Sequence, residues 1–298
     1  MHSRSSRDNK LPSCGTRIIC YHQEHYLADG TFIPALPLLE RGTGVTHVIF
    51  AALHLNHPDI APLTLNDDAW DSERAARVWE DASRLQSGGV QVLAMLGGAD
   101  HGSFAPLDGD YPTFAKHYAV LQSMICATGI DGLDLCVEEE MSLAGIVRLI
   151  DHLRTDFGQE FLVTLAPVGP ALRGGEQLSG FDYMELEKAM GSKIDWYNVQ
   201  FYCGWGSLQD THAYEAIIEQ GWDPSRVVAG TVTNPKICRG WVCDTVIRST
   251  LHALQKKYPR FGGVMGWEYT FSITSAHPCE GKPWLWAELM THILRTKS

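Results

Sequence analysis

Residues 129–140 read GIDGLDLCVEEE, a short apolar run with acidic residues set into it at regular intervals. On a β-strand, alternate side chains share one face. Asp134, Cys136 and Glu138 therefore point one way, and the intervening leucine and valine residues point the other way. The apolar face can pack beneath helices, whereas the polar face lines an interior in which charged groups must pair or do chemistry. The acidic pair Glu139–Glu140 is expected on a solvated surface.

Short apolar, β-branched runs recur along the chain, and amphipathic segments with helical spacing lie between them. The eight predicted strands cover Arg17–Tyr21, Val45–Leu53, Val90–Leu96, Ile130–Glu138, Phe161–Ala166, Ile194–Tyr202, Arg226–Thr231 and Gly262–Trp267. The predicted helices cover Ser72–Ser87, Thr113–Thr128, Leu143–Phe157, Tyr183–Met190, Thr211–Gln220, Thr245–Tyr258 and Trp284–Arg295. Alternation of strand and helix indicates a parallel sheet with helices outside it. Eight such units fit a closed (β/α)₈ TIM barrel, whose active site lies at the carboxyl ends of the strands.

An open, doubly wound sheet is the structural alternative. Such a sheet normally carries a glycine-rich phosphate turn after its first strand, whereas this chain has His22-Gln23-Glu24-His25 there. The barrel is therefore favoured. No Pro/Ser-rich linker divides the chain, so we predict a flexible N-terminus over residues 1–15 and one catalytic-type barrel over residues 16–298.

The composition excludes some classes of partner. The 298 residues carry 35 acidic and 24 basic side chains, a formal net charge of −11, which would repel nucleic acid. An oligosaccharide or another small-molecule ligand is compatible with this charge. The chain has no apolar run of the length that spans a membrane, and its polar start lacks the apolar stretch of a secretory signal. We therefore expect a cytoplasmic protein, secreted only if a signal was removed, and leave its oligomeric state open.

The chain has 8 cysteines, and none form a C-x-x-C pair or a zinc-binding spacing with histidine. No metal site and no cofactor are predicted. Cys238 and Cys243 are close enough to bridge one loop in an oxidising compartment. Without a secretory signal, reduced thiols are the expected state.

Five motifs follow one another in a recognisable order. Asp131, Asp134, Cys136 and Glu138 match a D-x-x-D-x-D-x-E pattern, except that cysteine stands in place of the third aspartate. The other four motifs are Met95-Leu96-Gly97-Gly98, Leu165-Ala166-Pro167, Gln200-Phe201-Tyr202-Cys203 and Gly263-Val264-Met265-Gly266-Trp267. From about Arg17 to Ile293 the sequence resembles glycoside hydrolase family 18, especially the short fungal and bacterial chitinases and endo-β-N-acetylglucosaminidases.

This resemblance implies substrate-assisted hydrolysis of β-1,4-linked N-acetylglucosamine with retention, an exception to the usual two-carboxylate scheme. Carried over, Glu138 is the acid/base, Tyr202 donates to the substrate acetamide and Trp267 forms the floor of the sugar site. Asp134 joins the catalytic set. The candidate substrate-binding residues are Trp267, Gln200, Tyr21, Met265, Cys136, Asp131 and Trp205. Trp241 is a further candidate sugar platform, and the strand-end histidines His54, His57 and His101 are interpreted as a polar rim.

Two positions depart from the family pattern, and a domain that many members of the family contain is not expected in this chain. Cys136 replaces a carboxylate beside a forming cation, so the resemblance implies slowed hydrolysis. Cys203 replaces a polar residue after Tyr202. Many larger members insert a small α+β domain after the seventh strand, but Thr231 and Thr245 are too close in sequence for one here.

Three functions stay open at this point. The first is an attenuated glycosidase acting on chitin oligomers or the core of N-glycans. The second is a catalytically impaired, chitinase-like sugar-binding protein. The third is a repurposed barrel that uses Glu138 on a non-sugar small molecule in specialised metabolism.

Overall fold

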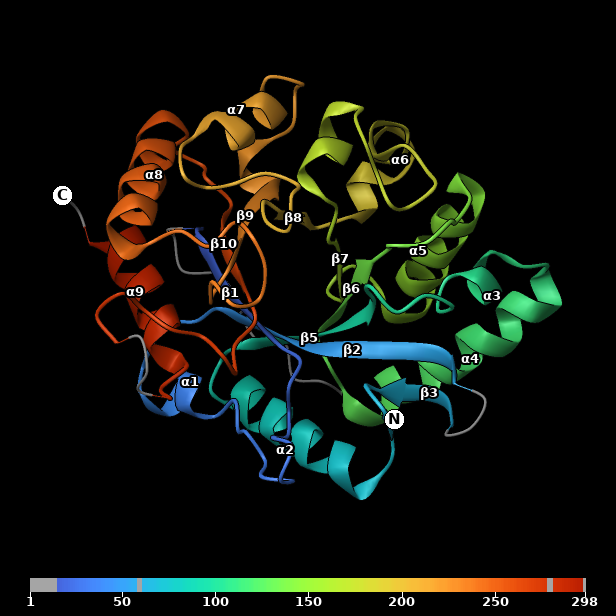
Figure 1. The fold of residues 1–298 in the computed structure, drawn as a ribbon. Helices are drawn as coiled ribbons and strands as arrows, with labels where there is room; N and C mark the ends of the chain where they lie inside the picture. Colours follow the sequence, from blue (N-terminus) through green and yellow to red (C-terminus); the bar gives the residue numbers. More distant parts are fainter. Residues whose placement is uncertain (1–14, 58–60, 278–280, 297–298) are drawn as a thin grey trace.

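The computed structural model describes residues 15–57, 61–277 and 281–296, and it shows eight parallel strands closed into a barrel with helices around it (Figure 1). The predicted flexible N-terminus lies outside the described residues except for Gly15. The predicted TIM barrel is confirmed. Among the helices of the described ranges, none is long and apolar enough to cross a membrane.

The barrel strands follow the predicted runs closely. They are β1 (Arg17–His22), β2 (His47–His57), β5 (Gln91–Gly97), β6 (Gly132–Cys136), β7 (Leu162–Leu165), β8 (Trp196–Gln200), β9 (Val227–Val232) and β10 (Gly263–Trp267). Each strand pairs in parallel with its neighbour in the order β1-β10-β9-β8-β7-β6-β5-β2, and a β1–β2 pairing closes the ring. The closed ring leaves none of these strands as an open edge.

The helices form an outer layer around the strands (Figure 1). Their bounds are α1 (Pro37–Glu40), α2 (Glu73–Ser87), α3 (Ala105–Asp108), α4 (Tyr111–Thr128), α5 (Leu143–Phe157), α6 (Tyr183–Met190), α7 (His212–Ile218), α8 (Asp244–Lys257) and α9 (Trp284–Arg295). Ser72, Asp110 and Ser142 cap the starts of α2, α4 and α5 by accepting hydrogen bonds from backbone N–H groups inside the first turn. Such caps fix where a helix begins.

Two apolar clusters make the core. The larger cluster fills the space between strands and helices and includes Leu133 and Leu135 of β6. The smaller cluster fills the barrel interior and includes Cys136, Tyr202 and Met265. The predicted division of β6 into an outward apolar face and an inward polar face is therefore observed.

A hairpin after β2 was not predicted. Strand β2 continues past the barrel, β3 (Ala61–Leu65) pairs antiparallel with it, and β4 (Asp68–Ala69) pairs antiparallel with β3. Asn66 in the β3–β4 turn accepts a hydrogen bond from the Ala52 N–H and donates one to the Gln23 carbonyl oxygen. The hairpin thus ties the carboxyl ends of β1 and β2 together.

The segment between β9 and α8, residues 233–243, is a loop without further strands or helices. It is too short to contain an inserted α+β domain, as predicted. This loop passes over the carboxyl-end mouth of the barrel, and its Ile237 and Trp241 pack against the interior cluster.

Candidate active site

Glu138 lies just past the carboxyl end of β6, and its carboxylate accepts hydrogen bonds from one side chain of β8 and one of β6. The Gln200 amide Nε2, at the end of β8, donates to Glu138 Oε1 at 3.0 Å and to the Ala166 carbonyl oxygen at 2.9 Å. The Cys136 thiol donates to the same Glu138 Oε1 at 3.3 Å. These contacts hold the Glu138 carboxylate at the mouth of the barrel, where it is only partly buried.

Cys136 is a neutral thiol in this setting. Burial raises its pKa well above the ordinary value of 9.0, and the nearby carboxylates of Glu138 and Asp134 raise it further. A thiolate at position 136, which could restore some of the missing negative charge, is therefore disfavoured. The side chain instead acts as a weak hydrogen-bond donor.

Asp134 lies one pleat deeper, fully buried in the barrel interior. Its carboxylate accepts hydrogen bonds from Tyr21 Oη at 2.7 Å, Thr164 Oγ1 at 2.5 Å and Asn198 Nδ2 at 3.0 Å. Burial raises the pKa of Asp134, and these hydrogen bonds oppose that rise. Tyr21 was predicted in the site, whereas Thr164 and Asn198 were missed. The inward parity of Asn198 with Gln200 on β8 is the signal that could have found Asn198.

Aromatic side chains gather above this network. Tyr202 is buried within the interior cluster, and its hydroxyl makes no hydrogen bond within the described residues. The Trp267 indole lies 5.5 Å from the Tyr21 ring, centroid to centroid, at an interplanar angle of 59°. Met265 and Trp241 contact the same cluster. The structure therefore brings Glu138, Tyr202 and Trp267 to one end of the barrel.

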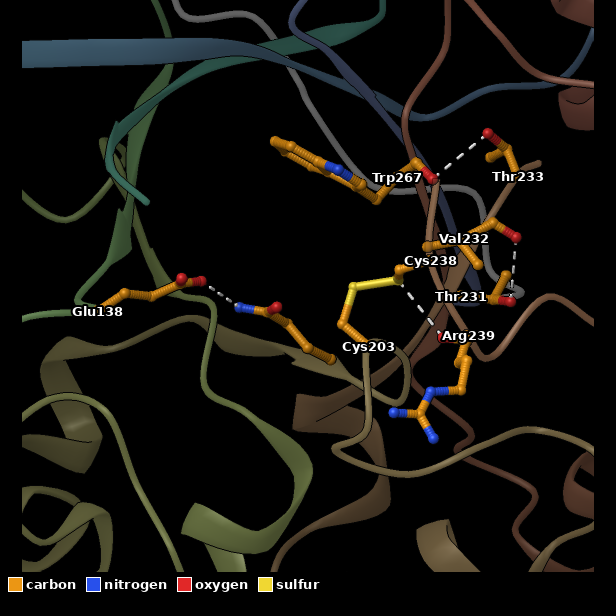
Figure 2. Close-up of a disulfide and its surroundings, with 9 residues drawn as sticks. Glu138, Cys203, Thr231, Val232, Thr233, Cys238, Arg239 and Trp267 are labelled. Carbon is orange, nitrogen blue, oxygen red and sulfur yellow. Dashed lines mark hydrogen bonds between the residues drawn. A yellow bond between two sulfur atoms is a disulfide. The ribbon is translucent and has the colours of Figure 1, made fainter. Parts of the chain in front are cut away.

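A disulfide joins Cys203, just after β8, to Cys238 in the loop after β9. The expectation of reduced thiols is therefore wrong for Cys203 and Cys238, and Cys238 does not bridge to Cys243, because the pairing of β8 with β9 brings the residues after these two strands together. Cys243 is free, and Cys14 and Cys279 lie outside the described residues. Figure 2 shows the disulfide below the Trp267 indole, with the Glu138 carboxylate facing it across the site.

Two predicted substrate-binding residues lie elsewhere. Asp131 precedes β6, and its carboxylate accepts a hydrogen bond from the Val92 N–H at 2.8 Å. It therefore stabilises the amino-end base of the barrel, away from Glu138. Trp205 packs against the outer core cluster, not the interior one. Asp131 thus has a structural role at the base of the barrel, and sugar binding by Trp205 stays a prediction.

Glu139 was expected on a solvated surface, but the structure gives its side chain hydrogen-bond partners. Its carboxylate accepts hydrogen bonds from the backbone N–H groups of Gly102 and Phe104 at 2.9 to 3.0 Å. It therefore holds the loop after β5, while Glu140 is exposed.

A polar cavity of about 700 Å³ opens beside β1 and the β3–β4 hairpin. His54 and His101 line it, as expected of a polar rim, and the side chain of His57 lies outside the described residues. Within the described ranges, no group of His, Cys, Asp and Glu is arranged to hold a metal ion.

The barrel, with a carboxyl group and aromatic rings at its carboxyl-end mouth, has the arrangement of a glycosidase. Two solved structures are similar over nearly their whole length. A fungal endo-β-N-acetylglucosaminidase of glycosyl hydrolase family 18 has 41% identity and a TM-score of 0.89, with 96% of this chain and 99% of that chain covered. Chitinase ChiC from Aspergillus fumigatus has 49% identity and a TM-score of 0.85, with 93% and 98% covered. The protein is a glycosidase, and the chain belongs to glycoside hydrolase family 18.

More distant structures share the fold alone. A putative chitinase A from Streptomyces coelicolor has 16% identity and a TM-score of 0.71, covering 95% of this chain and 99% of that one. Neither a scan against family models nor a search of curated protein sequences gives a match.

Proposed function

We propose that the protein hydrolyses β-1,4-linked N-acetylglucosamine, in chitin oligomers or in the core of N-glycans, with Glu138 as acid/base. The observation that carries this proposal is the position of Glu138, held by Gln200 and Cys136 at the mouth of the barrel beside Tyr202 and Trp267. The substrate class agrees with the two similar structures, one an endo-β-N-acetylglucosaminidase and one a chitinase.

In the proposed reaction, Glu138 protonates the glycosidic oxygen as the bond to the anomeric carbon breaks. The N-acetyl oxygen of the substrate attacks that carbon and forms a cyclic oxazolinium ion. Water then attacks the same carbon and gives up a proton to the Glu138 carboxylate, which opens the ring, restores the N-acetyl group and retains the anomeric configuration. The Tyr202 hydroxyl, which has no partner within the described residues, is available to donate to the acetamide oxygen. Trp267 offers an aromatic face to the sugar ring, a surface on which the apolar faces of sugars pack well.

We further propose that Cys136 slows this reaction. A carboxylate at this position would balance the positive charge of the oxazolinium ion, whereas the raised pKa of Cys136 keeps the thiol neutral. Loss of one preorganised electrostatic group typically lowers the rate about 100-fold to 1,000-fold. The side chain that orients Glu138 is thus also the side chain that limits turnover.

The test is release of reducing ends from chitooligosaccharides and from N-glycans by the oxidised protein. Glu138→Gln should lower kcat at least about 100-fold, because general acid catalysis contributes roughly that much. Glu140→Gln is the matched control, since Glu140 is exposed beside the site, and it should retain wild-type turnover. Equal turnover by wild type and Glu138→Gln would rule out the proposed role.

Binding measurements separate the alternatives. Affinity for chitooligosaccharides without cleavage would make the protein a sugar-binding member of the family. Absence of binding to any N-acetylglucosamine oligomer would favour a repurposed barrel with a non-sugar ligand.

The Cys203–Cys238 disulfide also supports a proposal about compartment. Disulfides form and persist in oxidising surroundings and are rare in the cytosol. We propose that the protein matures in an oxidising compartment, in place of the expected cytoplasmic one. Thiol counting on protein isolated from its source, under denaturing conditions without reductant, tests this: two reactive thiols at Cys203 and Cys238 would contradict it.

A further inference from the structure

We infer that the Cys203–Cys238 disulfide positions Tyr202 for the reaction, by clamping the residues that follow β8 to the loop that follows β9. This inference rests on the proposed function, because Tyr202 is there the donor to the substrate acetamide. Cys203 is the residue directly after Tyr202, so a constraint on Cys203 acts on the Tyr202 backbone with no intervening residue.

The loop after β9 packs on the Tyr202 backbone itself. Cys203 donates its N–H to the Arg239 carbonyl oxygen at 2.7 Å. At Gly240, whose φ is +113°, an added Cβ would lie 2.8 Å from the Tyr202 Cα and 2.9 Å from its Cβ. Only glycine allows this approach. The two residues directly after Cys238 therefore contact both Cys203 and Tyr202.

The backbone of Cys203 needs such support. Its φ is +54°, in the left-handed region that few residues other than glycine adopt. A residue in that region persists only where its surroundings hold it there. The disulfide and the bond to Arg239 supply two constraints from a loop that Ile237 and Trp241 anchor to the barrel interior. Without the disulfide, Tyr202 loses the stronger of the two.

The clamp can be opened without replacing a residue. Cys203 is exposed, so a dithiol such as dithiothreitol can attack the disulfide. Two electrons and two protons pass to Cys203 and Cys238, which become thiols, and the dithiol leaves as a cyclic disulfide. Reoxidation reverses the step.

The experiment is a double-mutant cycle between the disulfide and Tyr202, measured as kcat and KM on a chitooligosaccharide. The pair Cys203→Ser/Cys238→Ser should lower kcat about tenfold, within the 100-fold that a misplacement of about 1 Å can cost. In a protein that already carries Tyr202→Phe, the same pair of serine substitutions should change kcat less than about twofold. The effects of coupled residues do not add, and here the disulfide acts through Tyr202. Cys126→Ser is the matched control: Cys126 is an exposed free cysteine on α4 and should behave as wild type.

If the paired serine variant does not fold, reduction of wild type and its Tyr202→Phe form by dithiothreitol, followed by reoxidation, gives the same comparison. Reversible loss of kcat in wild type alone supports the inference. Unchanged kcat after loss of the disulfide, or an equal fall with and without the Tyr202 hydroxyl, overturns it while leaving the proposed function standing. An inactive oxidised protein, in both the natural and the Cys136→Asp form, overturns the proposed function and the inference with it.

Discussion

Position 136 shows how a thiol can keep the acidic side chain of a site in place without adding a charge. The thiol is buried, donates to Glu138 and lies within 3.7 Å of the Gln200 amide nitrogen. The hydrogen-bond geometry around Glu138 thus survives the loss of a carboxylate, but the negative charge does not. Under the proposed function, position 136 is therefore where orientation of the acid and electrostatic stabilisation of the intermediate can be tested separately.

Restoring the carboxylate should restore rate. Cys136→Asp is expected to raise kcat about 100-fold or more, the effect of regaining one preorganised charge beside the forming cation. Cys136→Asn, which is close in size and neutral, should give no comparable gain. Initial rates on a short chitooligosaccharide measure both, and a gain shared by the asparagine variant would show that charge is not the cause.

The residues of the site were only partly predictable from sequence. Strand parity was sufficient to place Cys136 with Glu138, and Gln200 with Tyr202, on inward faces. Asp131 was assigned to the site from the motif, although its place at the start of the strand puts it at the amino end of the barrel. Seven residues of extended strand separate Asp131 from Glu138, on the order of 20 Å, so membership of one motif does not imply membership of one site.

At the scale of elements, the base of the barrel depends on one buried arginine. Arg154 of α5 donates to the Lys193 carbonyl oxygen, to the Phe161 carbonyl oxygen and to the Asp195 carboxylate. The same Asp195 oxygen accepts from the Val163 N–H of β7. The side chain therefore joins α5 to the amino ends of two strands, at the end of the barrel opposite Glu138.

Arg154→Ala should lower the free energy of unfolding by about 3 kcal/mol, because it leaves Asp195 and buried carbonyl groups without their partner. Activity at low temperature should persist, since the contacts lie at the far end of the barrel. The control is Arg84→Ala, which breaks an exposed ion pair with Glu40 and should cost less than about 1 kcal/mol. Urea unfolding gives both values, and equal losses would contradict the role of Arg154.

The elements themselves were largely predictable, and the exceptions have physical causes. Eight apolar runs of strand length, separated by amphipathic helical segments, left little choice of architecture. The β3–β4 hairpin was missed because β3 is short and contains Pro62, which weakens a strand pattern. The disulfide was missed because Cys203 and Cys238 are 35 residues apart in sequence and lie in the loops after two different strands, which the pairing of β8 with β9 brings together.

At the scale of the whole molecule, three buried histidines make stability depend on pH. Burial lowers the pKa of His25 to about 4 and that of His47 to about 3, and it places that of His22 well below 6.5. The Arg17 guanidinium lowers the pKa of His47 further. The unfolded chain binds these protons more readily, so the stabilisation is complete above pH 6.5 and is lost as the pH falls toward 4.

His47→Gln should therefore lose less stability than wild type between pH 6.5 and 4, with each unit of pKa shift equivalent to about 1.4 kcal/mol. The raised pKa values of buried Asp134 and Glu268 act in the opposite direction, but they are common to both proteins. His212→Gln, at an exposed position, should keep the wild-type pH dependence. Urea unfolding at several pH values measures the free energy of unfolding of each protein. Parallel plots of this free energy against pH for His47→Gln and wild type would refute the expectation.

The pairing of the first strand with the last has a consequence for synthesis. Tyr21 of β1 and Trp267 of β10 come together only when Gly263–Trp267 pairs with Arg17–Cys20. A nascent chain still short of that final strand has an open ring, and it lacks the indole altogether. Translation products that end before Gly263 therefore contain neither a closed ring nor Trp267, so the complete site can form only after the last strand has been synthesised.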